Sequence, residues 1–154
     1  MEQKTICIDF DGVIHDYGKG WQGEDVFGQM IPNADTGTAT LKKNGWTIII
    51  FTTRKKTEKL EKWLEENNIS YDHINENPNQ PEHASGKIIA DVYLDDRGIC
   101  FRGRWDSWLM RDIIEFEPWQ EQQKREIEQL ATYGQTEDDI WSRGNEKRIK
   151  QAHV

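Results

Sequence analysis

Two aspartates separated by a single residue follow the first apolar run of the chain, which extends from Ile6 to Ile8. The run is short and rich in β-branched residues, which predicts a buried strand close to the N-terminus. Side chains two positions apart on a strand point to the same side, so Asp9 and Asp11 should project together from its carboxyl end. Two carboxylates this close repel each other unless a cation or a shared proton relieves them. The pair therefore indicates a site for a hard metal ion.

Three further polar groups stand beside later apolar runs. They are Thr52-Thr53-Arg54 after the run 48–51, Lys87 in the loop 85–87, and Asp95-Asp96 after the run 92–94. Because the carboxyl ends of parallel strands meet at one edge of a sheet, these groups should converge there with the first two aspartates. Carboxylate oxygens suit Mg²⁺, while a hydroxyl and an ammonium group suit the oxygens of a phosphoryl group. The set therefore predicts phosphoryl chemistry with Mg²⁺.

The elements that would position these groups alternate between strands and helices. Apolar patterning and turn residues predict strands at 4–10, 46–52, 71–74 and 90–94, helices at 32–44 and 55–67, and a loop or small flap at 12–31. This alternation implies a parallel sheet with right-handed crossovers. A further helix is expected at 121–133, ended by Gly134, with a second capped helix start at 136–139.

The composition is that of an acidic, polar chain long enough for one domain with a real core. Among 154 residues, 31% are charged and 35% are hydrophobic, and the net charge of −8 argues against general nucleic-acid binding. Cys7 and Cys100 are too few for a disulfide framework, and the first strand begins too early to leave room for a signal peptide. No apolar run approaches membrane-spanning length. We therefore expect a cytoplasmic protein without a membrane partner.

Taken together, the four groups resemble the sequence motifs of the haloacid dehalogenase (HAD) superfamily of phosphatases. Asp9-Phe10-Asp11-Gly12-Val13 is similar to the first motif, Thr52 to the second, Lys87 to the third and Asp95-Asp96 to the fourth. The resemblance spans residues 4–115 and implies an α/β, Rossmannoid HAD-like fold. This fold is a three-layer sandwich with a central parallel sheet, here with a small flap and a helical C-terminal tail. Receiver domains also gather such groups around Mg²⁺, but there the lysine comes after the other motifs.

The resemblance also implies a role for each residue. Asp9 would be the nucleophile that forms an aspartyl-phosphate, and Asp11 would be the general acid and then the general base. The phosphate would be bound by Thr52, Thr53 and Lys87. Mg²⁺ would be held by Asp9, the backbone carbonyl of Asp11, Asp96 and Asp95, and it stays open which of the last two contacts the metal directly. The implied activity is hydrolysis of a phosphomonoester.

The intervals between the motifs are too short for a full cap domain, which indicates a minimal, capless member with an open site. Thr52-Thr53-Arg54 and Asp95-Asp96-Arg97 also resemble the phosphatase half of polynucleotide kinase-phosphatases. This second resemblance implies that Arg54 helps to bind phosphate. A nucleotide or polynucleotide 3′-phosphate is therefore one expected substrate class, and a small nucleotide or sugar phosphate is equally compatible. The net charge disfavours long polynucleotides.

We expect a catalytic domain at 1–117 and a helical extension at 118–154 through which the chain would form homo-oligomers. Two other functions stay open: a non-catalytic domain that binds metal and phosphate for regulation, and transfer of the phosphoryl group to an acceptor other than water. Trp21 in the flap is a candidate for stacking on a base or covering the site, with a structural role as the alternative, while most of the other tryptophans are expected in packing positions. His15 is interpreted as a loop residue and Asn75 as a turn residue.

Overall fold

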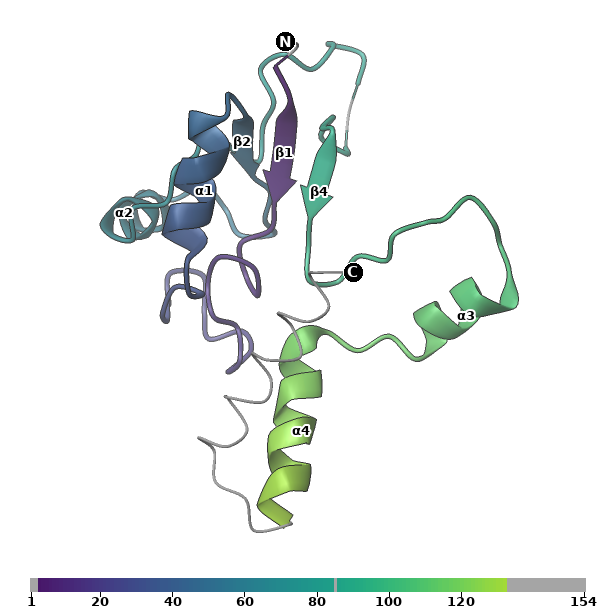
Figure 1. The fold of residues 1–154 in the computed structure, drawn as a ribbon. Helices are drawn as coiled ribbons and strands as arrows, with labels where there is room; N and C mark the ends of the chain where they lie inside the picture. Colours follow the sequence, from purple (N-terminus) through teal and green to yellow (C-terminus); the bar gives the residue numbers. More distant parts are fainter. Residues whose placement is uncertain (1–2, 85, 133–154) are drawn as a thin grey trace. The chain divides into compact units, whose positions relative to one another are not determined.

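The structure is a computed structural model that describes residues 3–84 and 86–132. Figure 1 shows the elements in chain order: β1 (Thr5–Ile8), α1 (Ala34–Lys43), β2 (Thr47–Ile50), α2 (Glu58–Glu66), β3 (His73–Ile74), β4 (Val92–Leu94), α3 (Ser107–Ile114) and α4 (Trp119–Thr132). The chain divides into two compact units, Met1–Arg102 and Gly103–Val154. The domain boundary expected at residue 117 stays a prediction, and the helix start expected at 136–139 lies outside the described residues.

The four strands of the first unit form one parallel sheet in the order β3-β2-β1-β4. In the centre of the sheet, Ile6 pairs with Ile48 on one side and with Val92 on the other. The sheet confirms the expected α/β class with a central parallel sheet, and it is consistent with a Rossmann-like three-layer fold. The chain builds outward from β1 to β3 and then returns to place β4 on the opposite side of β1. The strand order therefore reverses between β1 and β4, where open α/β sheets bind ligands.

Each face of the sheet buries its own apolar cluster, because neighbouring side chains on a strand point to opposite faces. One face is the larger: Ile6, Ile8, Ile48 and Ile50 pack with α2 and, more loosely, with α1. On the other face Cys7 and Ile49 pack with Ile88 from the segment between β3 and β4. This arrangement explains why the predicted strands carry uninterrupted apolar runs: the central positions are covered on both sides.

Helix α2 forms where local capping and patterning agree. The Thr57 hydroxyl accepts a hydrogen bond from the Leu60 amide at 3.2 Å and so caps the first turn. Leu60, Trp63 and Leu64 are spaced three or four positions apart and are buried against the sheet. The helix starts later than the expected residue 55, since Thr57, with extended backbone, is its N-cap.

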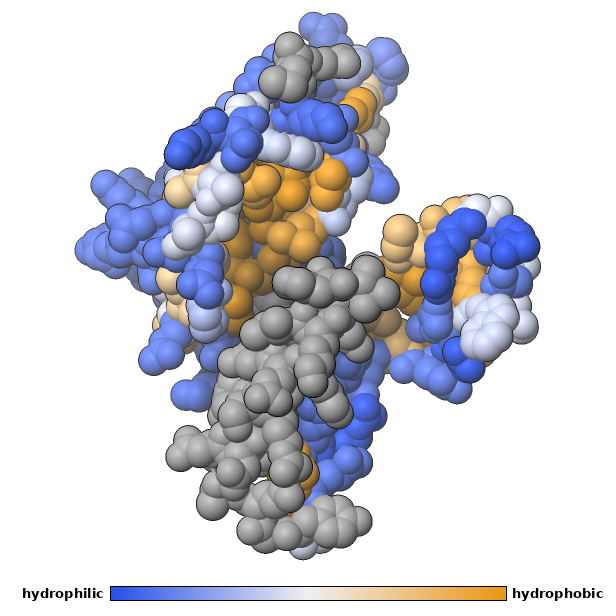
Figure 2. All heavy atoms as spheres, in the orientation of Figure 1, coloured by the Kyte–Doolittle hydropathy of each residue, from blue (hydrophilic) through white to orange (hydrophobic). Residues whose placement is uncertain are grey.

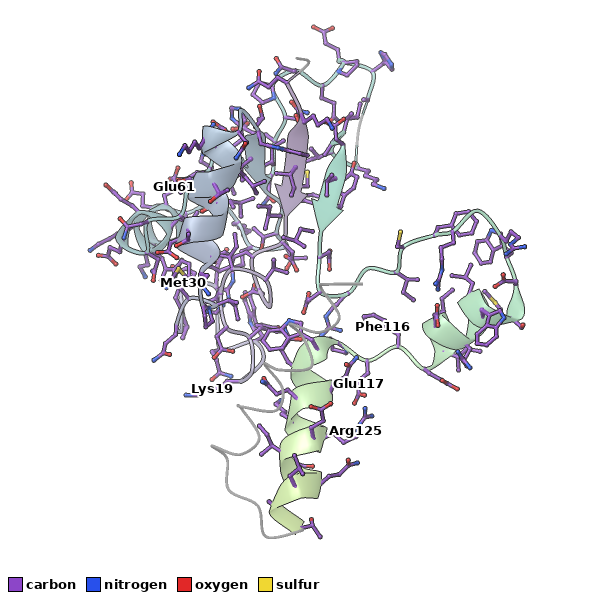
Figure 3. All side chains as sticks on the ribbon, in the orientation of Figure 1. Lys19, Met30, Glu61, Phe116, Glu117 and Arg125 are labelled. Atoms are coloured by element: carbon purple, nitrogen blue, oxygen red, sulfur yellow. The ribbon has the colours of Figure 1, made fainter. Side chains whose placement is uncertain are left out.

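The segment between β1 and α1 forms the expected small flap. Its neck is closed by two backbone hydrogen bonds, from the Asp16 amide to the Gln29 carbonyl at 2.8 Å and from the Ile31 amide to the Ile14 carbonyl at 2.7 Å. Lys19 within the flap and Met30 at its end are labelled in Figure 3. The flap residues 16–29 therefore make a closed loop whose two ends are fixed beside β1.

Strand β4 is more exposed than the strands beside it. Val92, Tyr93 and Leu94 are 41%, 39% and 49% exposed, because α1 and α2 cover only the side of the sheet formed by β1 to β3. Figure 2 shows apolar surface on the sheet of this unit. Trp105 and Trp108 are exposed, so the packing positions expected for the tryptophans other than Trp21 were wrong for these two.

In the second unit, helix α3 was not anticipated. The Asp106 carboxylate accepts a hydrogen bond from the Leu109 amide at 3.0 Å, which is the capping signal that the sequence offers. Helix α4 confirms the helix expected from Glu121. Glu117, two positions before α4, forms an ion pair of 2.5 Å with Arg125 in the second turn of the helix; both residues are labelled in Figure 3.

Within residues 3–84 and 86–132, no helix combines the length and the apolar character that crossing a membrane requires.

Replacing Ile48 by Ala should lower the free energy of unfolding by about 2–5 kcal/mol, because a fully buried side chain in the central sheet would be replaced by a cavity. Ile89→Ala is the matched control: Ile89 is 51% exposed, so the change should stay within about 0.5 kcal/mol. Urea unfolding followed by circular dichroism measures both. Equal losses in the two variants would contradict the described core.

Candidate functional site

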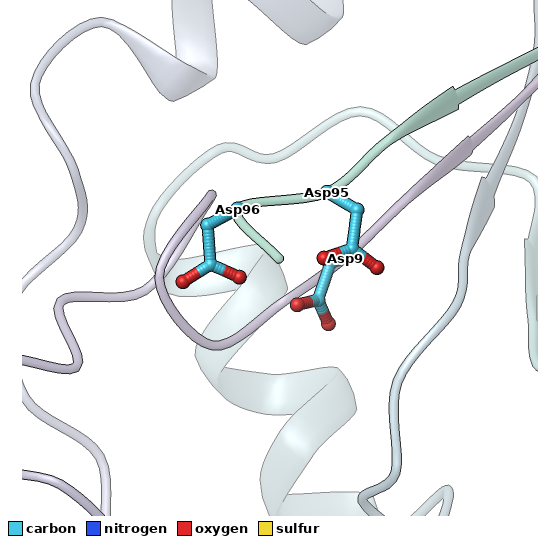
Figure 4. Close-up of side chains that lie close together, drawn as sticks. All are labelled: Asp9, Asp95 and Asp96. Atoms are coloured by element: carbon cyan, nitrogen blue, oxygen red, sulfur yellow. The ribbon is translucent and has the colours of Figure 1, made fainter. Parts of the chain in front are cut away.

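Three carboxylates meet where β1 and β4 end. Asp9 follows β1 directly, Asp95 and Asp96 follow β4, and one oxygen from each lies within 4.8 Å of the others (Figure 4). The two segments are held together because the parallel ladder continues past the strand ends: the Asp9 amide donates to the Leu94 carbonyl at 2.9 Å. The cluster lies at the point where the strand order reverses, which is the expected position for a ligand site in an open α/β sheet.

The electrostatics of Asp9 reflect this crowding. The pKa of the Asp9 carboxyl is raised to about 7 in total: partial burial raises it most, the hydrogen bond from the Phe10 amide lowers it, and the charges of Asp95, Asp96 and Asp11 raise it. A divalent cation bound between the carboxylates would offset their mutual repulsion. Three carboxylates with no nitrogen or sulfur among them suit a hard, oxygen-liganded ion such as Mg²⁺. The donor set therefore fits the cation expected from the sequence.

Asp11 is not one of the three clustered carboxylates, although its charge still raises the pKa of Asp9. Asp11 Oδ2 accepts from Arg54 Nε at 2.7 Å, and its Oδ1 accepts from Arg54 Nη2 at 2.9 Å and contacts His15 Nδ1 at 2.9 Å. Burial raises the pKa of Asp11, but the hydrogen bonds from His15 and Arg54 outweigh it and leave the pKa below its usual range. The expected metal contact through the Asp11 carbonyl stays a prediction.

Arg54 is buried, with 3% of its surface exposed, and its guanidinium binds protein groups. Besides the two bonds to Asp11, Nη1 donates to the flap carbonyls of Gly23 at 3.0 Å and Glu24 at 2.7 Å. The ring of Trp21 lies over the guanidinium, 4.5 Å from ring centroid to Cζ. These contacts favour a role in holding Asp11 and the flap, whereas the sequence resemblance suggested a phosphate contact.

The loop after β2 is shaped by Asn75, which sequence reasoning interpreted only as a turn residue. Its Oδ1 accepts from the Thr52 amide at 2.8 Å, and its Nδ2 donates to the Arg54 carbonyl at 2.9 Å. Asn75 has a φ of 57°, a left-handed conformation that asparagine tolerates better than most residues. The Thr52 hydroxyl accepts from the Arg54 amide at 3.2 Å, so its own hydrogen can be donated to a ligand. Thr53 is exposed at the tip.

Lys87 lies on the sheet face that carries Cys7. Its ammonium nitrogen is 4.4 Å from the ring centroid of Tyr93, the residue paired with Cys7 in the ladder. By strand alternation, Asp9 and Asp95 continue the same face beyond the strand ends. The lysine is thus on the side of the sheet where the acidic cluster begins, and its contact with phosphate stays a prediction.

His15 is a functional candidate that the sequence did not reveal as such. It was interpreted as a loop residue, but it is only 4% exposed and is stacked on Phe10 with ring centroids 5.0 Å apart. Its spacing of four residues from Asp11 offered a weak signal. The same holds for Asn75, which directly follows β3 and so stands at the same sheet edge as the other strand-end groups.

Comparisons with known proteins support the fold alone. No protein-family model and no curated protein matches the sequence. Among solved structures, the chain is similar to a conserved protein from Bacteroides thetaiotaomicron, with 23% sequence identity and a TM-score of 0.51. The similarity covers 77% of this chain and 95% of that protein. It agrees with the α/β architecture described above.

Asp9→Asn should stabilise the metal-free protein at about pH 8. The pKa of Asp9 is raised to about 7 by folding, so its contribution favours the folded state below about pH 4 and is lost as the pH rises towards 7. Asparagine removes the charge and keeps the oxygen that accepts from the Phe10 amide. After allowance for solvent screening, we expect a gain on the order of 1–3 kcal/mol at about pH 8 and little change at about pH 4.

Thermal unfolding with EDTA and with Mg²⁺ provides the measurement. Mg²⁺ should raise the melting temperature of the unmodified protein at about pH 8, and less so that of the variant. Asp16→Asn is the control, since the exposed Asp16 makes an equivalent bond to the Gly18 amide outside the acidic cluster. A variant at position 9 that is less stable than the unmodified protein at about pH 8 without metal would refute the prediction.

Proposed function

We propose that this chain is a Mg²⁺-dependent phosphomonoester hydrolase of the HAD type that acts through an aspartyl-phosphate. The observation that carries the proposal is the convergence of Asp9, Asp95 and Asp96 at the reversal of strand order. The next strand of the sheet adds Thr52 at its own carboxyl end, and the Phe51 amide still donates to the Ile8 carbonyl at 2.8 Å. An oxygen-rich metal site and a hydroxyl donor thus stand beside one carboxylate that can act as nucleophile.

In the first step, a carboxylate oxygen of Asp9 attacks phosphorus and forms a new P–O bond. The P–O bond to the leaving group breaks with its electron pair on the leaving oxygen, which takes a proton from Asp11 and departs as an alcohol. Because the pKa of Asp11 is lowered in the free protein, this step requires that Asp11 binds the proton together with the anionic substrate. In the second step, water attacks phosphorus, the bond to Asp9 breaks, and the Asp11 carboxylate takes the proton of the water. The products are the alcohol and inorganic phosphate, and both aspartates return to their starting states.

The hydrogen bonds around Asp11 restrict where its proton can reside. Oδ1 already receives two N–H groups, from Arg54 Nη2 and from His15, whereas Oδ2 receives only Arg54 Nε. A carboxylate oxygen has two lone pairs, so Oδ2 is the atom that can carry and release the proton. When bound by the three clustered carboxylates, Mg²⁺ supplies positive charge that stabilises the phosphoryl oxygens and keeps Asp9 ionised.

We infer the substrate class from the small size of the flap. Within the first unit, the flap between β1 and α1 has the length of a loop and not of a cap domain, which favours large phosphorylated substrates. The similarity to polynucleotide kinase-phosphatases makes nucleotides and polynucleotide 3′-phosphates the first esters to test. The exposed Trp21 offers a flat apolar ring over Arg54, the residue that binds Asp11.

Phosphate release from a panel of esters tests the proposal. The panel contains 3′- and 5′-nucleotides, 3′-phosphorylated oligonucleotides, sugar phosphates and an aryl phosphate, each with Mg²⁺ or with EDTA. We expect release with Mg²⁺ only, a loss of at least about 10³-fold in Asp9→Asn, and trapping of the phosphoryl group on Asp9 in the unmodified protein. Equal release by the unmodified protein and Asp9→Asn would refute the mechanism. Release to an added alcohol in preference to water would favour phosphotransfer.

Inhibition by inorganic phosphate distinguishes a role of Arg54 in binding phosphate from a role in holding Asp11 and the flap. A substitution at Thr52, the proposed phosphate ligand, serves as the reference. Thr52→Val removes the hydroxyl but keeps the shape of the side chain, and we expect it to weaken inhibition roughly tenfold. Arg54→Lys keeps the positive charge but loses the fork that holds Asp11 and the flap carbonyls. It should therefore lower turnover while the inhibition constant for phosphate changes by less than about threefold. A tenfold weaker inhibition in Arg54→Lys would assign this arginine to phosphate binding.

A further inference from the structure

The ring of His15 is buried, and each of its two nitrogens makes a hydrogen bond. Nδ1 lies 2.9 Å from Asp11 Oδ1, and Nε2 accepts from the Gly28 amide at 2.6 Å. The ring is fixed between aromatic neighbours: it stacks on Phe10 and meets Phe27 and Trp63 edge-on, with centroids 6.1 and 5.4 Å away. A histidine with 4% exposure and both nitrogens engaged is held in one orientation.

The Gly28 bond determines which nitrogen carries the hydrogen. A backbone amide can only donate, so Nε2 must offer its lone pair and bear no hydrogen. The hydrogen then resides on Nδ1, where it is donated to the Asp11 carboxylate. The second nitrogen of a histidine commonly sets the tautomer of the first in this manner.

Gly28 is fixed from its other side as well. Its carbonyl accepts from Trp63 Nε1 of helix α2 at 3.2 Å, so the end of the flap is anchored to the core. The chain of contacts therefore runs from the Trp63 indole through the Gly28 peptide and the His15 ring to the Asp11 carboxylate. Arg54 completes the network by binding both Asp11 and the carbonyls of Gly23 and Glu24 in the middle of the flap.

We propose that His15 is a positioning residue for proton transfer: as the Nδ1–H tautomer, it joins the Asp11 carboxylate to the anchored flap backbone. The proposal rests on the proposed function, because it assigns His15 to the step in which Asp11 gives a proton to the ester oxygen. With Oδ1 held by His15 and Arg54, Oδ2 faces a fixed direction. A rotated carboxyl would place the proton away from the leaving oxygen, and small errors of this kind reduce rates strongly.

Two substitutions test the hydrogen bonds of the two ring nitrogens of His15 one at a time. In His15→Asn the amide nitrogen takes the place of Nδ1, so the bond to Asp11 can be kept while the bond to Gly28 is lost. In His15→Gln the amide oxygen takes the place of Nε2, so Gly28 keeps its acceptor while Asp11 loses its donor. Asp11→Asn defines the complete loss of proton transfer, and Asp9→Asn defines the complete loss of phosphoryl transfer.

The rates are compared for an alkyl and an aryl phosphate with Mg²⁺. The value of kcat/KM covers the steps up to departure of the leaving group, and an aryl oxide departs without a proton whereas an alkoxide needs one. We expect His15→Gln to lower kcat/KM for the alkyl ester by about tenfold or more and for the aryl ester by less than about threefold. His15→Asn should change the ratio between the two esters less than His15→Gln does. A variant that is merely damaged in folding would lower both values by the same factor.

Nitrogen-15 chemical shifts of the His15 ring supply a readout independent of turnover. We expect a hydrogen on Nδ1 and an unprotonated Nε2 in the unmodified protein. An Nε2–H tautomer, or an unchanged ester ratio in His15→Gln, would overturn the proposal. If the unmodified protein hydrolyses none of the esters with Mg²⁺, the proposed function is refuted, and with it the role of His15 in proton transfer. The chemical shifts would still show whether His15 donates from Nδ1 to Asp11 and accepts at Nε2 from Gly28.

Discussion

The pairing of β1 with β4 is the interaction on which the site depends. These strands are far apart in the sequence, and the hydrogen bond from the Asp9 amide to the Leu94 carbonyl extends their ladder to the residue that bears the first carboxylate. Because the strands are parallel, this bond places Asp9 directly beside the start of Asp95-Asp96. The repulsion among the carboxylates is therefore imposed by backbone pairing, and the free energy of forming the sheet maintains it.

Asp9 and Asp11 have different surroundings because the strand ladder ends at Asp9. Asp9 still belongs to the ladder, but after it the chain turns, and the Phe10 carbonyl accepts from the amides of Ile14 and His15 at 3.0 and 2.9 Å. Asp11 is thereby directed towards Arg54. One carboxylate is crowded by like charges and the other is surrounded by donors, so their pKa values move in opposite directions. The proposed roles need the reverse order, so bound Mg²⁺ would have to lower the pKa of Asp9 and the anionic substrate would have to raise that of Asp11.

Sequence patterning predicted the sheet well because its strands are short apolar runs with turn residues around them. It predicted that Asp9, Asp95 and Asp96 would converge, since that needs only parallel strands and their ends. It did not predict the direction of the Asp11 side chain, because the two-residue periodicity of a strand no longer applies once the chain leaves the ladder. The burial of His15 and Arg54 was equally out of reach. Both depend on the contacts of the flap with His15 and Arg54, tertiary contacts that leave no periodic signal in the sequence.

The two cysteines differ in exposure, so the rates at which they are alkylated report how often the sheet opens. Cys7 is 1% exposed in β1, and burial raises the pKa of its thiol to about 11, with Lys87 acting weakly in the opposite direction. Cys100 is exposed and lies four positions beyond Asp96. Because the thiolate is the reactive form, an alkylating reagent at neutral pH will modify Cys100 in the folded protein. It will reach Cys7 only when the central strand separates from its neighbours, so the rate of the second modification measures how often the sheet itself comes apart.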